Sequence, residues 1–294
     1  MTVRDVTAGA PSSTWTSGES RQPVQDSEGI QFLQWCLPRL GLRWQGFRKV
    51  RKRVYKRLAR RIQELGLSGI SAYRSHLDTH AGEWAILDGL CRIPISRFYR
   101  DRGVFQHLEE EVLPELGRLA VARGETELHC WSIGCASGEE PYTLAILWRL
   151  GPGSRVPDLR LRVLATDVDP ENLARARRGC YARSSLKDLP PAYLEQAFVP
   201  TAREWRLGEV YQEDVTFAEQ DVRQAAPPGP FHLVLCRYVA FTYFDEGRQR
   251  DVLRTIVERL VPGGALVIGS AESLPDGVPG LEVWSAKSRT YRRT

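Results

Sequence analysis

Two adjacent glutamates, Glu139 and Glu140, stand at the start of a predicted helix and could bind a cationic ligand. They follow a short apolar run and a turn in which Gly134 and Gly138 let the backbone bend sharply and approach that ligand. A dinucleotide site would place a pyrophosphate at this helix start, where two carboxylates would repel it. S-adenosylmethionine carries a sulfonium and an ammonium instead, so the sequence predicts this cofactor.

A second candidate is Asp167, which ends the β-branched and apolar run 161–167. In an open α/β sheet, an acid at the carboxyl end of the second strand can accept two hydrogen bonds from a ribose diol. The alternative is that Asp167 caps the helix that follows, although Asp169 lies closer to that helix. The next predicted strand leads to Asp221 and Val222, which we expect at the adenine edge of the cofactor.

Several spaced motifs carry a resemblance to one family. They are Trp-Ser-x-Gly-Cys-x-Ser-Gly-Glu-Glu-Pro-Tyr (131–142), Ala-Thr-Asp-Val-Asp (165–169), Cys-Arg followed by Tyr-Phe-Asp (236–245), and Leu-Val-Pro-Gly-Gly-Ala-Leu-Val-Ile-Gly-Ser-Ala-Glu-Ser-Leu (260–274). The chain resembles the CheR methyltransferases over about residues 29–294. Those enzymes esterify glutamates of bacterial chemotaxis receptors with S-adenosylmethionine, so the resemblance implies a protein-glutamate methyltransferase. It also places Tyr238 and Val239, after the fourth predicted strand, at the cofactor.

The resemblance further implies the catalytic residues. Residues 96–100, Ser-Arg-Phe-Tyr-Arg, are similar to the family's Thr-x-Phe-Phe-Arg, whose hydroxyl and arginine reach the cofactor and the acceptor carboxylate. Ser96 and Arg100 take these roles here, and Tyr243 matches a tyrosine whose hydroxyl lies near the transferred methyl. Without the resemblance, Arg100 would be interpreted as a surface arginine and Tyr243 as a core aromatic residue.

Three departures from the family leave the acceptor open. Tyr238 stands where the family has asparagine, and one extra residue separates Val239 from Tyr243. Pro94 and Ile95 replace the polar residues that precede the hydroxyl residue in the family. The insert before the strand at Val215 is short, and 204–210 could form a hairpin without the family's glycine-rich loop. The sequence therefore also allows a CheR-like methyltransferase with another acceptor, or a non-catalytic module that binds the cofactor and signals.

Composition and patterning predict an α/β fold, a doubly wound Rossmann-like methyltransferase domain preceded by a small all-helical domain. We expect a disordered tail at 1–28, helices at 29–118, a linker at 119–126 and the cofactor-binding domain at 127–294. No apolar run approaches the eighteen or so residues of a membrane span, so we expect a cytoplasmic protein. The six cysteines show no CxxC pair, which favours buried reduced thiols and no metal site.

A basic helix over 48–61 is the predicted partner surface. Apolar residues recur at helical spacing from Phe47 to Leu65 and are expected to pack inward. Between them lie nine basic residues with no acid: Arg48, Lys49, Arg51, Lys52, Arg53, Lys56, Arg57, Arg60 and Arg61. The resemblance implies docking on an acidic receptor-like helical bundle. The alternatives are a solvated face, or binding to nucleic acid or an anionic membrane, and no zinc-finger or RNP-like motif supports nucleic acid.

Overall fold

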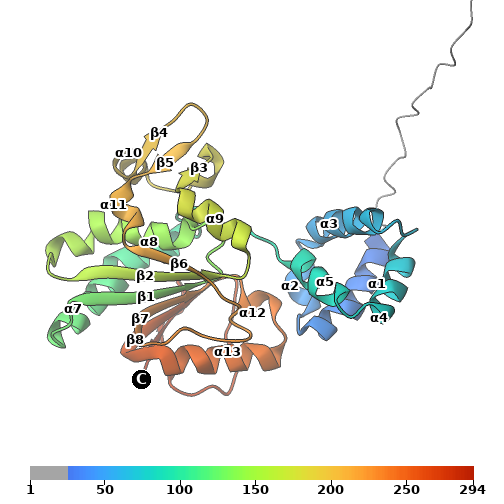
Figure 1. The fold of residues 1–294 in the computed structure, drawn as a ribbon. Helices are drawn as coiled ribbons and strands as arrows, with labels where there is room; N and C mark the ends of the chain where they lie inside the picture. Colours follow the sequence, from blue (N-terminus) through green and yellow to red (C-terminus); the bar gives the residue numbers. More distant parts are fainter. Residues whose placement is uncertain (1–25) are drawn as a thin grey trace, which may run out of the picture.

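The computed structural model describes residues 26–294, which form a cluster of helices beside a larger α/β part (Figure 1). The tail predicted over 1–28 falls outside the described residues except for 26–28, which begin helix α1. No helix within 26–294 combines the length and apolar character needed to cross a membrane.

The helical cluster buries the apolar stripe that the sequence predicts. Phe47, Val54, Leu58 and Ile62 are buried, and the basic residues between them lie on the outer side of the helix or at its flanks. The helices are α1 (Asp26–Cys36), α2 (Trp44–Phe47), α3 (Arg51–Glu64), α4 (Ile70–Thr79) and α5 (Glu83–Cys91), with a 3₁₀ turn at Leu37–Leu40.

A seven-stranded, mostly parallel sheet forms the centre of the α/β part, as predicted. The strand order is β6-β2-β1-β7-β8-β10-β9, and β10 is the one strand antiparallel to its neighbours. The strands are β1 (Glu127–Ile133), β2 (Arg160–Asp167), β6 (Val215–Glu219), β7 (Phe231–Cys236), β8 (Leu260–Ile268), β9 (Leu281–Ser285) and β10 (Thr290–Arg293). Because β2 and β6 lie on one side of β1, and β7 and β8, which follow them in the chain, lie on the other side, the chain reverses its winding between β1 and β7. Ligands of such sheets bind at the carboxyl ends of the strands near this point.

Helices cover both faces of the sheet (Figure 1). One apolar cluster joins α6, α7 and α8 to side chains such as Leu128 and Leu161, and the other joins α12 and α13 to Trp131 and Val234. The helices are α6 (Arg102–His107), α7 (Leu113–Ala122), α8 (Glu139–Leu150), α9 (Pro170–Arg178), α10 (Pro191–Ala197), α11 (Glu209–Gln212), α12 (Ala240–Tyr243) and α13 (Glu246–Arg259). A π-helical turn at Leu108–Val112 joins α6 to α7, and 3₁₀ turns lie at Pro152–Arg155 and Arg183–Leu186.

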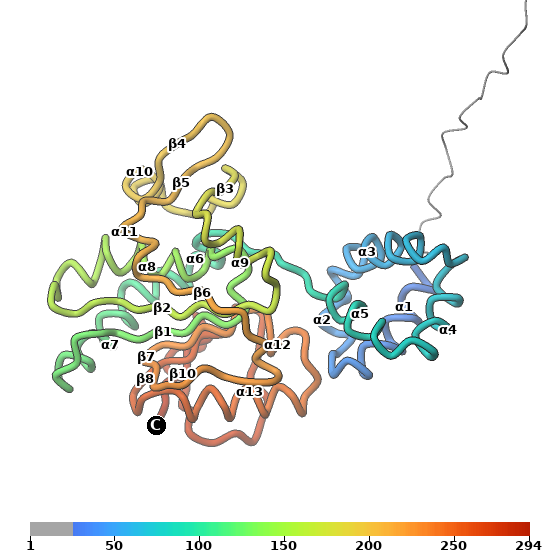
Figure 2. Tube along the Cα trace, viewed as in Figure 1, coloured from blue at the N-terminus to red at the C-terminus, as the bar shows by residue number. Residues whose placement is uncertain are grey.

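The structure differs from the expected linker at 119–126. Residues 119–122 are the last turn of α7, which packs on β1 and β8 and so belongs with the sheet. An extended segment, 92–97, instead leads from the helical cluster to the α/β part (Figure 2). Helical periodicity alone could not show that α6 and α7 belong with the sheet and not with the helices before them. We propose 92–97 as the domain boundary.

A second, three-stranded antiparallel sheet projects from the α/β part. Its order is β3-β5-β4, with β3 at Cys180–Tyr181, β4 at Phe198–Pro200 and β5 at Trp205–Leu207. The hairpin expected at 204–210 is therefore displaced: its two strands are β4 and β5, and α11 begins at Glu209.

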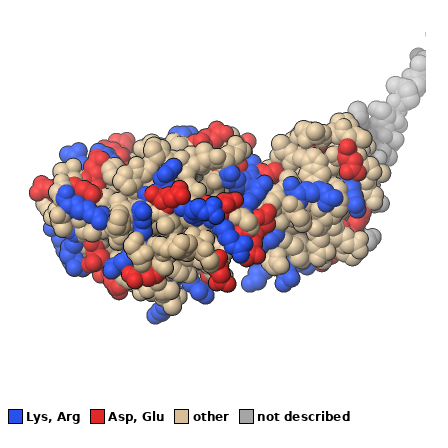
Figure 3. Space-filling view, turned by 90° about the horizontal axis from the view of Figure 1, so that it is seen from below, with Lys and Arg blue, Asp and Glu red and all other residues tan. Residues whose placement is uncertain are grey.

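Several contacts join the helical cluster to the α/β part. The backbone N–H of Arg43 donates to the carbonyl of Tyr243 at 2.9 Å, and Leu42 forms an isolated bridge with Phe244. Arg223 reaches across to Asp88 of α5 with two hydrogen bonds of 2.7 and 2.9 Å. Around this junction acidic and basic side chains lie next to one another (Figure 3).

Candidate active site

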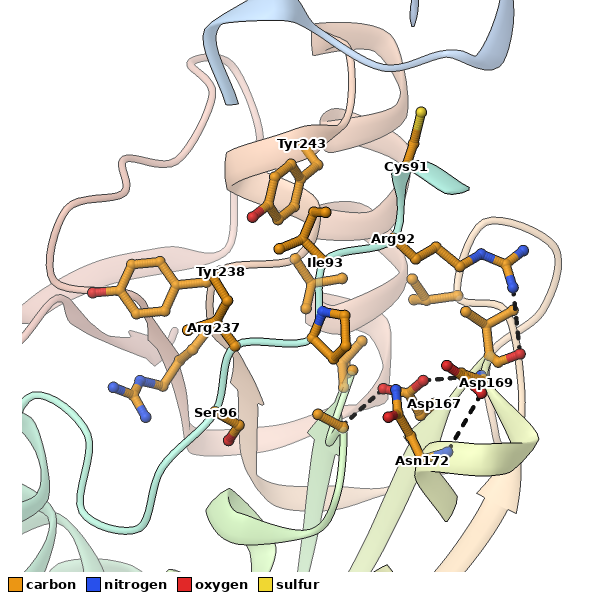
Figure 4. Close-up of a pocket in the computed structure, with 18 of the residues that line it drawn as sticks. Cys91, Arg92, Ile93, Ser96, Asp167, Asp169, Asn172, Arg237, Tyr238 and Tyr243 are labelled. Atoms are coloured by element: carbon orange, nitrogen blue, oxygen red, sulfur yellow. Dashed lines mark hydrogen bonds between the residues drawn. The ribbon is translucent and has the colours of Figure 1, made fainter. Parts of the chain in front are cut away.

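A cavity opens at the carboxyl ends of the central strands, between the sheet and the segment 92–97. In Figure 4, Tyr238 and Tyr243 lie on one side of it and Asp167 and Asp169 on the other. The structure brings nearly all the predicted site residues to its wall: Ser96, Arg100, Gly134, Glu140, Asp167, Asp221, Val222, Tyr238, Val239 and Tyr243. The remaining one, Glu139, lines an adjoining hollow together with Ser96.

The strand register explains why the first two motifs meet. Ile133 at the end of β1 pairs with Thr166 in β2, and the carbonyl of Thr166 accepts the backbone N–H of Gly134 at 2.8 Å. Gly134 has φ of 68°, and a Cβ atom there would lie 2.4 Å from the Cγ2 atom of Val239. Only glycine therefore lets the turn pass this close to the segment after β7.

Asp167 is held at the bottom of the cavity by backbone donors. Its carboxylate accepts the N–H groups of Ala136 and Asp169 at 2.8 and 2.9 Å. Burial raises the pKa of Asp167 above its ordinary value, although these hydrogen bonds oppose the shift. Asp169 caps α9 by accepting the N–H groups of Glu171 and Asn172, so the capping role considered for Asp167 belongs to its neighbour.

The two adjacent glutamates have different surroundings. Glu140 accepts a hydrogen bond from Ser132 at 2.8 Å and forms an ion pair of 3.0 Å with Arg237. Glu139 is buried, and its Oε2 atom has no hydrogen-bond partner among the described residues. Burial raises the pKa of Glu139. Glu139 is thus the carboxylate with an oxygen available to a ligand, a distinction that the sequence pattern could not make.

The acid after β6 also has a protein partner. Asp221 binds Arg223 through three side-chain hydrogen bonds of 2.7 to 3.0 Å, and the same guanidinium binds Asp88. Burial alone would raise the pKa of Asp221, but the hydrogen bonds from Arg223 and its charge together hold the pKa below its ordinary value. Because its carboxylate is engaged, Asp221 shapes the cavity wall, and Val222 beside it offers an apolar surface.

Arg237, which follows β7, lies at the centre of a buried ionic network that the sequence did not reveal. Its side chain is 2% exposed and pairs with Asp101 at 2.9 Å as well as with Glu140. It also donates to the carbonyl of Arg100 at 2.7 Å. Burial alone would raise the pKa of Asp101, but hydrogen bonds from Tyr238 and Arg237, and the charge of Arg237, hold it low. Arg237 therefore anchors the loop that carries Arg100.

Glu272 is a second residue that sequence reasoning missed, although it lies within the quoted motif 260–274. It is 4% exposed and accepts the backbone N–H groups of Tyr238 and Gly269 at 2.9 and 2.6 Å. It also accepts the hydroxyl of Thr242. Burial raises the pKa of Glu272. These bonds fix the segment between Tyr238 and Tyr243, whose ring packs against Phe47 with centroids 5.1 Å apart.

Left-handed backbone conformations concentrate at this site. Of the non-glycine residues with positive φ in 26–294, four lie at the cavity or in the loop beside it: Tyr99 (58°), Asp101 (64°), Ala136 (48°) and Tyr238 (58°). Such conformations cost about 1–3 kcal/mol each and persist where surrounding contacts enforce them. Asp101 and Tyr238 are enforced by the Arg237 and Glu272 contacts described above.

The fold and the site together define the class of this protein. A doubly wound sheet with an acidic, partly apolar cavity at the reversal of its winding is the architecture of a Rossmann-like enzyme that binds a nucleoside-containing cofactor. Residues 95–289 match the family model described as "CheR methyltransferase, SAM binding domain". The chain belongs to this family and is an S-adenosylmethionine-dependent methyltransferase.

Curated relatives are similar in sequence to this protein over most of its chain. A protein of Rhizobium etli named "Probable chemotaxis protein methyltransferase" is 35% identical over 226 residues, which cover 74% of this chain and 83% of the relative. The "Chemotaxis protein methyltransferase" of Escherichia coli is 34% identical over 235 residues, covering 76% and 77%. Among solved structures, the N-methyltransferase NodS of Bradyrhizobium japonicum is 18% identical, with a TM-score of 0.35 over 66% of this chain and 90% of that one.

The residues present fit the cofactor. The orphaned Oε2 atom of Glu139 can accept the cofactor's ammonium group, and Gly134 leaves room where a Cβ would collide with Val239. When bound, S-adenosylmethionine supplies a methyl group activated by its sulfonium. We propose that Ser96, Gly134, Glu139 and Asp167 hold the cofactor, with Val222, Tyr238 and Val239 forming its walls.

Proposed function

We propose that this enzyme methylates a carboxylate, most plausibly glutamate side chains of a chemotaxis-type receptor in the cytoplasm. The observation that carries the proposal is the chemistry of the cavity wall: no histidine or lysine is among its described lining residues, and Arg100 is. The names of the relatives from Rhizobium etli and Escherichia coli support the chemotactic setting.

The carboxylates on the wall are already committed to other partners. Asp88 and Asp221 bind Arg223, Glu140 binds Arg237, Asp167 accepts two backbone N–H groups, and Asp169 caps α9. An amine or phenol acceptor would need a base to remove its proton. A carboxylate acceptor is already deprotonated at neutral pH, so it needs only to be bound, oriented and shielded from water.

Arg100 and Tyr243 have complementary roles in this proposal. Arg100 pairs with the acceptor carboxylate, since a guanidinium can bind both oxygens side by side. Tyr243 closes the cavity from α12, and burial raises the pKa of its hydroxyl, which stays protonated at neutral pH. A protonated hydroxyl can donate a hydrogen bond but cannot serve as a base. Both residues therefore position the acceptor.

The surface that would receive the acceptor is the exposed side of α3 and of the turn before it, because the helix predicted over 48–61 begins only at Arg51. Arg48, Lys49, Lys52, Arg53 and Lys56 are exposed and form no ion pair within 26–294. Phe47, which immediately precedes these basic residues, packs on the ring of Tyr243 with centroids 5.1 Å apart, so this basic segment lies near the active site. We propose that an acidic helical bundle docks here.

A base-stability assay tests the proposal. Purified enzyme transfers radiolabelled methyl from S-adenosylmethionine to total cell protein, and mild base should release the label as methanol, because methyl esters hydrolyse there and methylated amines do not. Arg100→Ala should lower the transfer by about 100-fold or more, while its affinity for S-adenosylhomocysteine falls far less. Arg102→Ala is the matched control, because Arg102 is exposed and lies outside the cavity.

A different acceptor is the second candidate, favoured by Tyr238 and by the Pro94-Ile95 pair at the cavity wall. Base-stable label that still depends on Arg100 would support that candidate and overturn the carboxylate proposal.

A further inference from the structure

The side chain of Arg100 lies on the ring of Tyr238. The Cζ atom of the guanidinium is 4.0 Å from the ring centroid. A single hydrogen bond, from its Nη1 atom to the carbonyl of Ile95, ties it to the described chain. A guanidinium stacked face-on against an aromatic ring keeps its N–H edges free, and such edges bind the two oxygens of a carboxylate side by side.

Tyr238 is itself fixed from several directions. Its hydroxyl donates to the Oδ2 atom of Asp101 at 2.5 Å and lies 2.9 Å from the hydroxyl of Ser270. Its backbone N–H is bound by Glu272. The ring also depends on Gly269 for space, because a Cβ atom there would lie 2.8 Å from the ring atoms Cε1 and Cζ.

These contacts link the segment after β7 to the loop 99–101 that carries Arg100. Asp101, adjacent in sequence to Arg100, receives both the Tyr238 hydroxyl and the Arg237 guanidinium. The ring therefore supports the arginine side chain while the hydroxyl secures the backbone beside it. An asparagine, which the family has at this position, could supply neither the aromatic surface nor the phenolic hydroxyl.

We propose that Tyr238 is a positioning residue for Arg100, setting the plane of the guanidinium that binds the acceptor carboxylate. This inference rests on the proposed function. In place of an asparagine, Tyr238 offers an aromatic surface for the residue at position 100. Such a surface supports the planar charge of an arginine and favours arginine over lysine there.

A double-mutant cycle tests the inference. The substrate is a purified receptor cytoplasmic fragment with glutamates at its methylation positions, and the measured quantities are kcat and KM for that fragment. Tyr238→Leu, which removes the ring, should lower kcat/KM by about 30-fold, and Tyr238→Phe, which keeps the ring, by about 5-fold. In the Arg100→Ala background, Tyr238→Leu should cost less than about 2-fold further. Fully additive losses, or equal losses in the Phe and Leu variants, would overturn the proposal.

A second measurement does not depend on the acceptor. An arginine-specific dicarbonyl reagent, phenylglyoxal, is applied to the full-length protein, and modification of Arg100 is followed by peptide mass spectrometry. Tyr238→Leu should speed modification of Arg100 several-fold over the parent and over Tyr238→Phe, with exposed Arg102 as the internal reference. An unchanged rate in a folded variant would contradict the positioning role. If the parent does not methylate the fragment yet this rate changes, the proposed acceptor fails and the positioning role stands.

Discussion

Single side chains at the carboxyl ends of β1 and β2 are proposed to bind different groups of the cofactor. Asp167→Ala should weaken binding of S-adenosylhomocysteine by about 1–3 kcal/mol, because the variant loses the proposed ribose hydrogen bonds and the two backbone bonds that shape the turn. Titration calorimetry measures this loss. Asp245→Ala is the control: losing the cap of α13, outside the cavity, should lower stability by about 1 kcal/mol but leave affinity nearly intact. Equal affinity in the Asp167 variant and the parent would show that this carboxylate only organises the turn.

Replacing Glu139 is expected to stabilise the ligand-free protein but to weaken its binding of the cofactor. Its raised pKa means that the ligand-free fold disfavours the charged carboxylate, so this group's stabilising contribution is present at low pH and is lost as pH rises through the raised pKa. Glu139→Gln should therefore unfold at higher urea concentration than the parent at pH 7, with a smaller difference at low pH. Affinity for S-adenosylmethionine should fall about 10-fold, because the ammonium loses its anionic partner. A variant that is less stable and binds equally well would exclude this role.

At the scale of elements, the basic surface formed by α3 and the turn before it can be tested directly. Reversing Lys49, Lys52 and Lys56 to glutamate should raise KM for an acidic receptor fragment about 10-fold at low salt, and the difference should shrink as salt screens the charges. Three exposed basic residues elsewhere, Arg118, Arg254 and Lys287, provide a control with the same change in net charge. Equal KM values for both triple variants would leave the basic side of α3 as a solvated surface.

The structure also shows that four arginines of the basic segment 48–61 have hydrogen-bond or ion-pair partners. Arg51 pairs with Asp26, Arg60 with Glu64, and Arg61 with Glu83, while Arg57 donates to backbone carbonyls of Leu90 and Arg92. The acids come from other elements or from the end of the helix, so a count of charges within 48–61 could not show them. The docking variants above avoid these four arginines, because Arg51, Arg57 and Arg61 join α3 to other parts of the helical cluster and Arg60 is paired within α3.

Local sequence patterns predicted the helices and strands better than they predicted the contacts between them. The strand ending at Asp167 and the helix from Glu139 to Leu150 follow directly from period-two and helical spacing. The expected linker failed because helical spacing does not reveal which core a helix joins, and α7 joins the sheet. Likewise, Arg237 and Glu272 act through contacts with residues far away in sequence, such as Asp101 and Thr242, which no spacing rule encodes.

At the scale of the whole molecule, an ionic link joins the helical cluster to the wall of the cofactor cavity. Arg223 sits between two carboxylates, Asp221 beside β6 and Asp88 on α5, and all three line the cavity. Burial alone would raise the pKa of Asp88, but the hydrogen bonds from Arg223 and Arg92, together with the charges of these two arginines, lower the pKa. The largely buried Arg223 therefore adds an ionic link to the backbone contacts of Leu42 and Arg43 that hold the helical cluster beside the cofactor site.

Arg223→Met should accordingly destabilise the protein by about 3–5 kcal/mol at pH 7, because two largely buried carboxylate side chains lose their shared partner. The lowered pKa values of Asp88 and Asp221 mean that this stabilisation is present above their ordinary pKa of about 4 and is lost as pH falls through the lowered values. Urea unfolding should thus show the parent and the variant converging on acidification. Affinity for S-adenosylhomocysteine should fall as well. Arg149→Met, which breaks the pair with Asp214 away from the cavity, should cost stability without that loss of affinity. If both variants bind alike, the junction at Arg223 stabilises the fold without shaping the cofactor site.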